Sequence, residues 1–404
     1  MKLKMLIVLG LLVSFLLVFT DGVSQAEEQV INGQAEVESK EALDQLVDEQ
    51  FNILKVDEIQ MYWERIAAEY GGFLPESQKG SLSDFLKGDK QFQLKEWGLG
   101  LVKFLLHEFI VNGKLLGMLL LLTIFSYILQ SFQNAFEHQT VSKAAYSVTL
   151  LVLCMIAMNG FHTAITYAME AIDTMVHFTI ALLPLLLAMM ASLGGLSSSA
   201  LFHPVIIFLV HTSGLLVNTF VLPMLFISAV LGIVSTFSDN YKVTRLANLF
   251  RVGAIGLLGV FMTVFLGVVS VQGTTAAAAD GLTIRTAKFI AGNFIPVVGR
   301  IFTDATDTVM SASLLLKNTV GMSGLVVLLA ICAFPAMKVL SIALIFQLSA
   351  AVLQPLGNGA IIECLAIIGK SVLYVFAAMA LIGFMFFLAI TVLVAASNIA
   401  FMMR

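Results

Sequence analysis

The sequence predicts an all-α, polytopic integral membrane helical protein with a small N-terminal exported helical domain and a re-entrant or interfacial segment. Hydrophobic residues make up 59% of the 404 positions and only 12% are charged, about half the charged share of soluble proteins. The charge is also uneven, because residues 27–98 hold 16 of the 26 acidic side chains and 7 of the 22 basic ones. The remainder of the chain is too poor in charge to be solvated by water, and lipid is its expected solvent.

Residues 1–26 are typical of a signal peptide. Lys2 and Lys4 precede an apolar run over 5–19, and small residues precede the expected cleavage after Ala26. An uncleaved membrane anchor is the alternative, although the run is shorter than the ~20 residues of a span. In either case the following segment is exported, because the leading lysines stay in the cytoplasm.

Residues 27–98 are predicted to form an acidic helical exported domain. Apolar residues such as Ile59, Trp63 and Ile66 recur at steps of three and four, and the pair at 71–72, Gly-Gly, supplies a helix stop. All three cysteines lie in later apolar stretches. The domain therefore has no disulfide framework to stabilise it.

Residues 99–111 are predicted to form an interfacial amphipathic helix, with Leu101, Leu105 and Phe109 on one face. A last helix of the exported domain is the alternative. Beyond this helix, residues 112–404 are predicted to form a multi-span membrane domain with about nine spans. The expected spans are 112–133, 144–163, 174–193, 200–217, 218–236, 252–271, 319–336, 339–356 and 371–397.

The stretch 200–236 is the least certain of these assignments to separate spans. As one helix it would extend ~55 Å across a hydrocarbon core of ~30 Å, so a tight helical pair is preferred. A single helix there would reduce the count to eight. The lysines and arginines of the loops do not distinguish the two counts.

Two stretches of the sequence partly match catalytic motifs, and each lacks a required residue. Gly369-Lys370-Ser371 matches the end of a P-loop, but Cys364 stands where the first glycine is required. His107 and Glu108 begin like a zinc-protease helix, but no second histidine follows at the required spacing. We therefore predict no enzymatic activity, no cofactor and no metal site. Nucleic acid is not an expected partner either, because no basic stripe with interleaved aromatic residues is present.

Ionisable and amide residues interrupt the apolar stretches at helical spacing. The candidate intramembrane polar stripe comprises Glu170, Asp173, His177, His203, His211 and Asn218. Ionisable groups within a membrane mark an ion or proton path or a pairing between helices. The structural alternatives are hydrogen bonds between neighbouring helices and a first helical turn that faces water.

The segment near 284–303 is predicted to be re-entrant or interfacial. Its apolar centre, 289–302, is too short to span a bilayer and is interrupted by proline. Irregular backbone at membrane depth persists only where protein or water satisfies it, so we expect a lining or gating element. A surface-lying amphipathic helix is the alternative. The candidate conduit or gating residues are Arg285, Lys288, Asn293, Pro296, Arg300, Asp304 and Asp307.

The layout and the segment Arg285-Thr-Ala-Lys288 … Asn293-Phe-Ile-Pro-Val-Val-Gly-Arg300 … Asp304 together resemble the stage III sporulation protein AE family of endospore-forming bacilli. The resemblance covers the whole chain. It implies a non-enzymatic subunit of a sporulation channel or secretion-like complex that links mother cell and forespore and is needed for late forespore development. The family has no assigned catalytic residues, so none is transferred to this chain.

The same resemblance implies the partners and the location. The expected partners are other stage III sporulation A-type membrane proteins and a forespore membrane protein, in an oligomeric or hetero-oligomeric complex embedded in the lipid bilayer. The expected location is the mother-cell membrane that surrounds the forespore, crossed several times, with the N-terminal domain exported. An autonomous secondary transporter is the alternative function, and inverted repeats with paired broken helices would mark it.

Overall fold

The computed structural model describes residues 57–75, 94–135, 140–193, 196–237, 243–294, 298–356 and 359–402. Within these ranges the side chains of 274–313, and of some other residues, most of them near helix ends, are not described. The chain divides into two compact units, Met1–Phe51 and Asn52–Arg404, and all described residues belong to the second. Every regular element in these ranges is a helix. The predicted all-α, polytopic membrane fold is confirmed. The predicted signal peptide lies outside the described residues.

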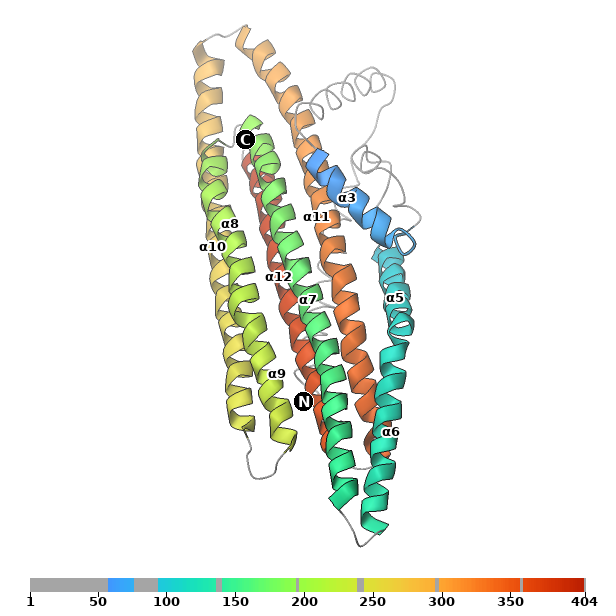
Figure 1. Cartoon of the computed structure of the whole chain (residues 1–404). Coiled ribbons are helices and arrows are strands. Elements are labelled where there is room, and N and C mark those ends of the chain that lie inside the picture. Colours follow the sequence, from blue (N-terminus) through green and yellow to red (C-terminus); the bar gives the residue numbers. More distant parts are fainter. Residues whose placement is uncertain are drawn as a thin grey trace. The chain divides into compact units, whose positions relative to one another are not determined.

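Long helices run side by side through the described unit (Figure 1). Helices α6, α9 and α11 end, and α7, α10 and α12 begin, at one end of the bundle, which we call the α9–α10 end. Helices α7 and α10 end, and α8 and α11 begin, at the opposite end, which we call the α10–α11 end. The elements are α3 (Asp57–Tyr70), α5 (Leu94–Val111), α6 (Gly113–Ala135), α7 (Thr140–Ser192), α8 (Leu196–Leu216), η2 (Val217–Val221), α9 (Leu222–Phe237), α10 (Thr244–Phe294), α11 (Val298–Leu353), η3 (Gln354–Leu356) and α12 (Ala360–Met402).

Within the described ranges, five helices are long and apolar enough to cross a membrane, and the bent pair α5–α6 makes a sixth candidate. The expected nine spans are therefore corrected to five or six. Three predicted pairs are continuous columns: 144–192 lies in α7, 319–353 in α11, and 200–236 in α8–η2–α9. The prediction divided each column at one membrane thickness, yet the helix continues through each predicted break. Pro184 and Pro335 are both accommodated inside helices.

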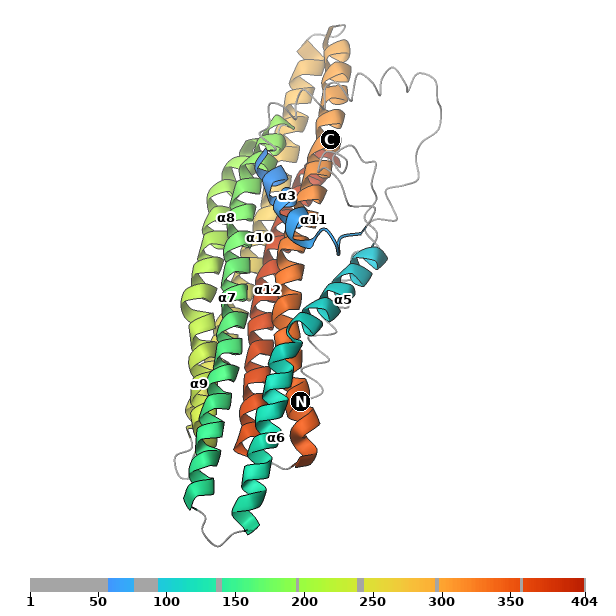
Figure 2. The ribbon, with the colours of Figure 1, turned by 45° about the vertical axis from the view of Figure 1, so that its right-hand side comes forward.

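Helices α5 and α6 meet at Asn112 with a bend of 46°. Trp97 and Phe104 on α5 are buried, whereas Leu106 and Ile110 are exposed on its other side. The predicted interfacial helix 99–111 thus lies in α5, which leads directly into α6 and carries apolar residues on both its buried and its exposed side. Figure 2 shows how α5 leans away from the bundle. Helix α3 ends at Tyr70, so the predicted glycine stop is confirmed.

The column α8–η2–α9 contacts two different neighbours. Gly214 in α8 faces Val176 of α7, and Gly232 in α9 faces Ile367 of α12. Between them, the Leu222 N–H donates to the Val217 carbonyl, five residues earlier. This π-type bond inserts one extra residue into the helix.

Glycine allows α11 and α12 to approach closely at one point. A side-chain carbon on Gly383 of α12 would overlap the Cys332 Sγ of α11 and meet the Met175 Sδ of α7. The same addition at Gly256 of α10 would meet nothing within 4 Å. Gly383 is therefore a packing glycine, whereas Gly256 faces open space.

Two cysteines 210 residues apart in the sequence meet in the core. The Cys154 Sγ of α7 and the Cys364 Sγ of α12 are 3.3 Å apart, and both thiols are free and buried. A disulfide needs ~2.05 Å between the sulfurs, so a small approach suffices. We expect membrane-permeant oxidant to join them within one chain, measured as the loss of two alkylatable thiols after denaturation. Cys154→Ser should leave both remaining thiols alkylatable, and unchanged thiols in the native chain would contradict this packing of α7 on α12.

Candidate functional site

The two halves of the predicted polar stripe meet between α7 and η2. The Asn218 Nδ2 donates to the Asp173 Oδ1 at 2.7 Å. His177 Nδ1 lies 2.7 Å from the Asp173 carbonyl of its own helix. The oxygen of the same side-chain amide, Asn218 Oδ1, is buried and has no hydrogen-bond partner. An unpaired buried acceptor is costly, so this atom is open to a further donor.

The rest of the stripe is split between two surfaces. Glu170, Asp173 and His177 are exposed halfway along α7, between two apolar halves of that helix. His203 and His211 are also exposed on α8, but no hydrogen bond joins either of them to Asp173 in the described part of the chain. The structure therefore unites Asp173, His177 and Asn218, and leaves the two α8 histidines apart.

Lys338, in the second half of α11, was not predicted as a site residue. Its Nζ donates to the Glu69 Oε1 of α3 at 2.8 Å. The same Nζ lies 5.1 Å from the Tyr70 ring centroid and 5.7 Å from that of Tyr167. A lone lysine between two long apolar stretches was the available sequence signal, because such a charge needs a partner.

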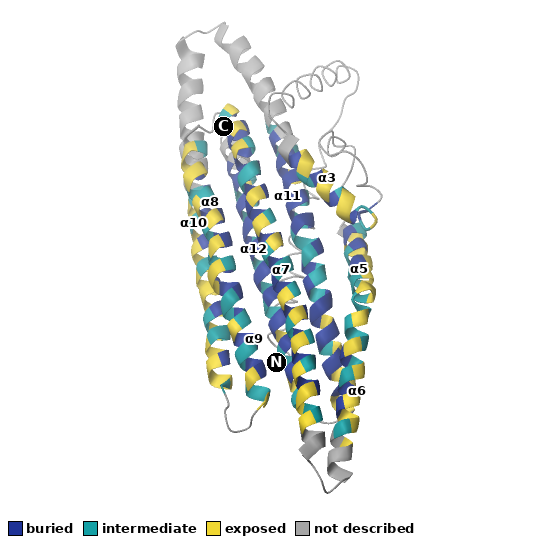
Figure 3. Cartoon of the chain, viewed as in Figure 1, coloured by how far each residue is buried: buried dark blue, intermediate teal, exposed yellow. Residues whose placement is uncertain are grey.

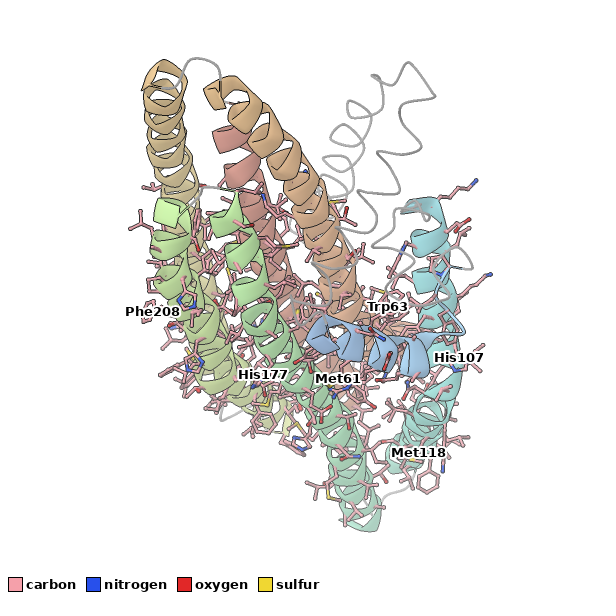
Figure 4. The ribbon with its side chains drawn as sticks, turned by 90° about the horizontal axis from the view of Figure 1, so that it is seen from above. Met61, Trp63, His107, Met118, His177 and Phe208 are labelled. Atoms are coloured by element: carbon pink, nitrogen blue, oxygen red, sulfur yellow. The ribbon has the colours of Figure 1, made fainter. Side chains whose placement is uncertain are left out.

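Helix α3 lies across α7 and α11 at this level (Figure 4). Trp63 is 1% exposed and packs toward the bundle, whereas Met61 is 55% exposed. The Tyr62 ring meets Phe178 of α7 edge-on at 5.2 Å, and the Tyr70 ring stacks on Phe334 of α11 at 4.4 Å. Part of the predicted exported domain is therefore docked on the membrane helices.

The Glu69 carboxylate is held in its charged form by these contacts. Burial alone would raise its pKa, but hydrogen bonds with Lys338 and Tyr70 outweigh that effect and the pKa is lowered. Burial and the neighbouring Glu69 raise the pKa of the Tyr70 hydroxyl. At neutral pH, Lys338 therefore faces the charged carboxylate of Glu69 and the neutral phenol of Tyr70.

These side chains form a polar layer, which we define as Glu69, Tyr167, Asp173, Asn218 and Lys338. Large exposed apolar residues lie mainly on one side of it, and Figure 3 shows which parts of the helices are exposed. From Asn218 to the end of α9 the column extends ~29 Å, close to the ~30 Å of a hydrocarbon core. The large exposed apolar residues on the α9–α10 side of the layer include Val148, Leu151 and Met155 of α7, Ile227 and Val234 of α9, Leu249, Val252 and Ile255 of α10, and Leu344, Leu348 and Val352 of α11.

On the α10–α11 side of the layer, α7 behaves differently. Beyond Asp173 this helix exposes no large apolar side chain in its described part, and His177 and Pro184 are among its exposed residues. Other helices do expose large apolar side chains on this side: Leu201, Phe208 and Leu215 on α8, Val271 on α10 and Met322 on α11. The α9–α10 half thus has a surface suited to lipid, and the other half has a mixed one.

The predicted conduit or gating residues lie at the α10–α11 end. Arg285, Lys288 and Asn293 belong to the last turns of α10, and Arg300, Asp304 and Asp307 to the first turns of α11. Pro296 lies outside the described residues, as do the side chains of the other six. The backbone is helical up to Phe294 and again from Val298, so most of the predicted re-entrant segment near 284–303 lies in two helices.

No catalytic constellation stands out within the described residues. They contain no group of three or more histidine, cysteine, aspartate or glutamate side chains able to hold a metal ion. The Asp173 group offers a carboxylate, an imidazole and an amide on the surface of a membrane helix. Such a set can exchange protons, bind a polar partner or line a water-filled path.

Comparison with known proteins places the chain in a family. The family model for stage III sporulation protein AE matches residues 77–397. Stage III sporulation protein AE of Bacillus subtilis (strain 168) is 58% identical over 373 residues, covering 92% of this chain and 94% of the relative. No solved structure matches the chain. With a family model over most of its length and a relative that similar, this sporulation protein of the membrane belongs to the stage III sporulation protein AE family.

Proposed function

We propose that this protein is a non-enzymatic, multi-span subunit of a channel or secretion-like complex that links mother cell and forespore. It resides in the mother-cell membrane around the forespore, with α3 on the exported side. Its partners are other stage III sporulation A-type membrane proteins and a forespore membrane protein. The polar layer is the observation that carries this proposal, because its Asp173 is exposed beside Asn218 midway along apolar columns, with the exposed Glu170 one turn away on α7.

The length of α7 supports the proposal, because this helix is longer than the hydrocarbon core of a bilayer is thick. The apolar part of α7, Ala144–Ser192, has 49 residues and extends ~73 Å, more than twice a hydrocarbon core of ~30 Å. If lipid covers the α9–α10 half, the part of α7 beyond Asp173, ~29 Å long, projects on the side where α3 docks. The exposed apolar residues of α8 need a protein cover there, which a subunit of a larger complex obtains from its neighbours.

The charges of the polar layer support contact with water or a polar partner. Exposed carboxylates on a membrane helix face a protein partner or an aqueous cavity rather than acyl chains. The Asp173–Asn218 hydrogen bond fixes one of these carboxylates at the α7–η2 contact. Neighbouring subunits can then complete a path along this face of α7.

The test is a paired charge removal at this layer. Glu170→Gln with Asp173→Asn keeps the shape of both side chains and removes both charges, so we expect normal protein abundance but loss of most heat-resistant spores and of late forespore reporter activity. Glu64→Gln, at an exposed position of α3, is the control and should sporulate normally. Unimpaired sporulation of the double variant would contradict the proposal.

An autonomous secondary transporter remains the second candidate. The π segment η2 carries Asn218 partway along an apolar column, and helices with interrupted regular geometry are typical of transporters. Purified protein reconstituted alone in liposomes distinguishes the two functions. Substrate uptake driven by an ion gradient without partner proteins would favour the transporter.

A further inference from the structure

Three basic residues lie toward the α9–α10 end, on the neighbouring helices α10 and α12. Arg245 and Arg251 lie in the first two turns of α10, and Lys370 lies in α12. The Arg251 guanidinium carbon is 5.6 Å from the ring centroid of Tyr374 on α12. Lys370 stands one helical turn before Tyr374, on the same face of α12. Arg251 and Lys370 therefore border the same α10–α12 contact.

These cations have no anionic partner among the described residues. No hydrogen bond or ion pair involves Arg245, Arg251 or Lys370 in that part of the chain, and the Arg251 Nε is buried without an acceptor. Glu363, two turns before Lys370, is the nearest acid along α12 and is exposed. Burying a guanidinium nitrogen without an acceptor costs free energy. An anion from outside the chain would supply the missing acceptor and lower that cost.

The surroundings indicate an anion that arrives with acyl chains. Leu249 and Val252, beside Arg251 on α10, are 67% and 57% exposed. This end closes the half of the bundle whose surface suits lipid, about one hydrocarbon thickness from the polar layer. Basic pockets between membrane helices at a bilayer surface bind phosphate head groups, and arginine can bind phosphate through two parallel hydrogen bonds.

We propose that Arg251, Lys370 and Arg245 form a binding site for the phosphate of an anionic phospholipid at the α10–α12 contact. Arg251, oriented by the Tyr374 ring, is the central donor, and the two exposed cations complete the charge. The acyl chains lie along the apolar surface of α10. The lipid thereby bridges α10 and α12 at the end of the bundle where this cation cluster lies.

The experiment uses the purified full-length protein in a neutral detergent, with thermal unfolding measured while lipid is titrated. Phosphatidylglycerol should raise the unfolding temperature in a saturable way, whereas phosphatidylcholine and millimolar inorganic phosphate should not. Lys370→Gln changes an exposed residue and should weaken phosphatidylglycerol binding about fivefold. Arg251→Lys keeps the charge but loses the planar fork, and it should also bind more weakly.

The matched control is Lys103→Gln, which removes an exposed cation from α5, far from this contact in the sequence. It should bind phosphatidylglycerol with unchanged affinity. Equal stabilisation by phosphatidylcholine, or unchanged affinity in Lys370→Gln and Arg251→Lys, would overturn the proposal. Equal stabilisation by inorganic phosphate would also overturn it, in favour of a soluble anion.

Discussion

Replacing Gly383 with leucine is expected to destabilise the membrane domain by about 3 kcal/mol, because overpacking a tight helix contact forces side chains and backbone apart. Even a single carbon at this position would overlap the Cys332 Sγ, with Met175 on the other side. The measurement is the thermal unfolding temperature of purified protein in detergent, together with its abundance in membranes. Both should fall.

Gly256→Leu is the matched control for this prediction. It makes the same substitution inside a membrane helix, but a side chain at Gly256 meets nothing within 4 Å. We expect unchanged abundance and an unfolding temperature equal to or above that of the native chain, because leucine favours helix more than glycine does. Equal losses in the two variants would show that the α11–α12 approach at Gly383 is looser than described.

Trp63→Ala should release α3 from the bundle. Trp63 is 1% exposed, and truncating a buried tryptophan costs about 3 kcal/mol or more. The contact between Glu69 and Lys338 is partly exposed and contributes too little to hold α3 by itself. Hydrogen exchange of residues 57–70, followed by mass spectrometry, should show faster exchange there while α7, α11 and α12 remain protected.

Met61→Ala shortens an exposed side chain on the same helix and provides the control. Its exchange over 57–70 should match that of the native chain. If Trp63→Ala also left the exchange of α3 unchanged, the docking of this helix on α7 and α11 would be wrong. If the whole bundle exchanged faster, α3 would prove to be part of the core rather than a docked element.

The part of the chain that needs lipid as its solvent, and the buried face of α3, could be predicted from composition and residue spacing. The scarcity of charge after residue 98 identified the part of the chain that needs lipid, and the steps between Ile59, Trp63 and Ile66 gave the buried face of α3. The glycine pair after Tyr70 marked the end of that helix. These signals are local, because periodicity and helix stops depend on residues within a few turns.

The length of the columns could not be predicted in the same way. A limit of about one membrane thickness divided α7 and α11 into separate spans, although nothing in their sequences reverses the chain. The polar residues at the predicted breaks, such as Asp173 and Lys338, are instead satisfied by Asn218 and Glu69 from distant parts of the chain. Tertiary partners of this kind are invisible to an analysis of one segment at a time.

The extra residue of η2 also affects how this column can change in evolution. Gly214 and Gly232 are 18 residues apart, five full turns of a regular α-helix, and would point in the same direction if every residue between them were α-helical. The π turn changes this direction by about 100°, which lets one glycine meet α7 and the other meet α12. Deleting a single amino acid within 217–221 would leave 17 regular steps, which give the same offset of about 100°, so both contacts would be kept. A one-residue deletion should therefore be tolerated within the π turn, whereas the same deletion in the regular helix beside it should be selected against.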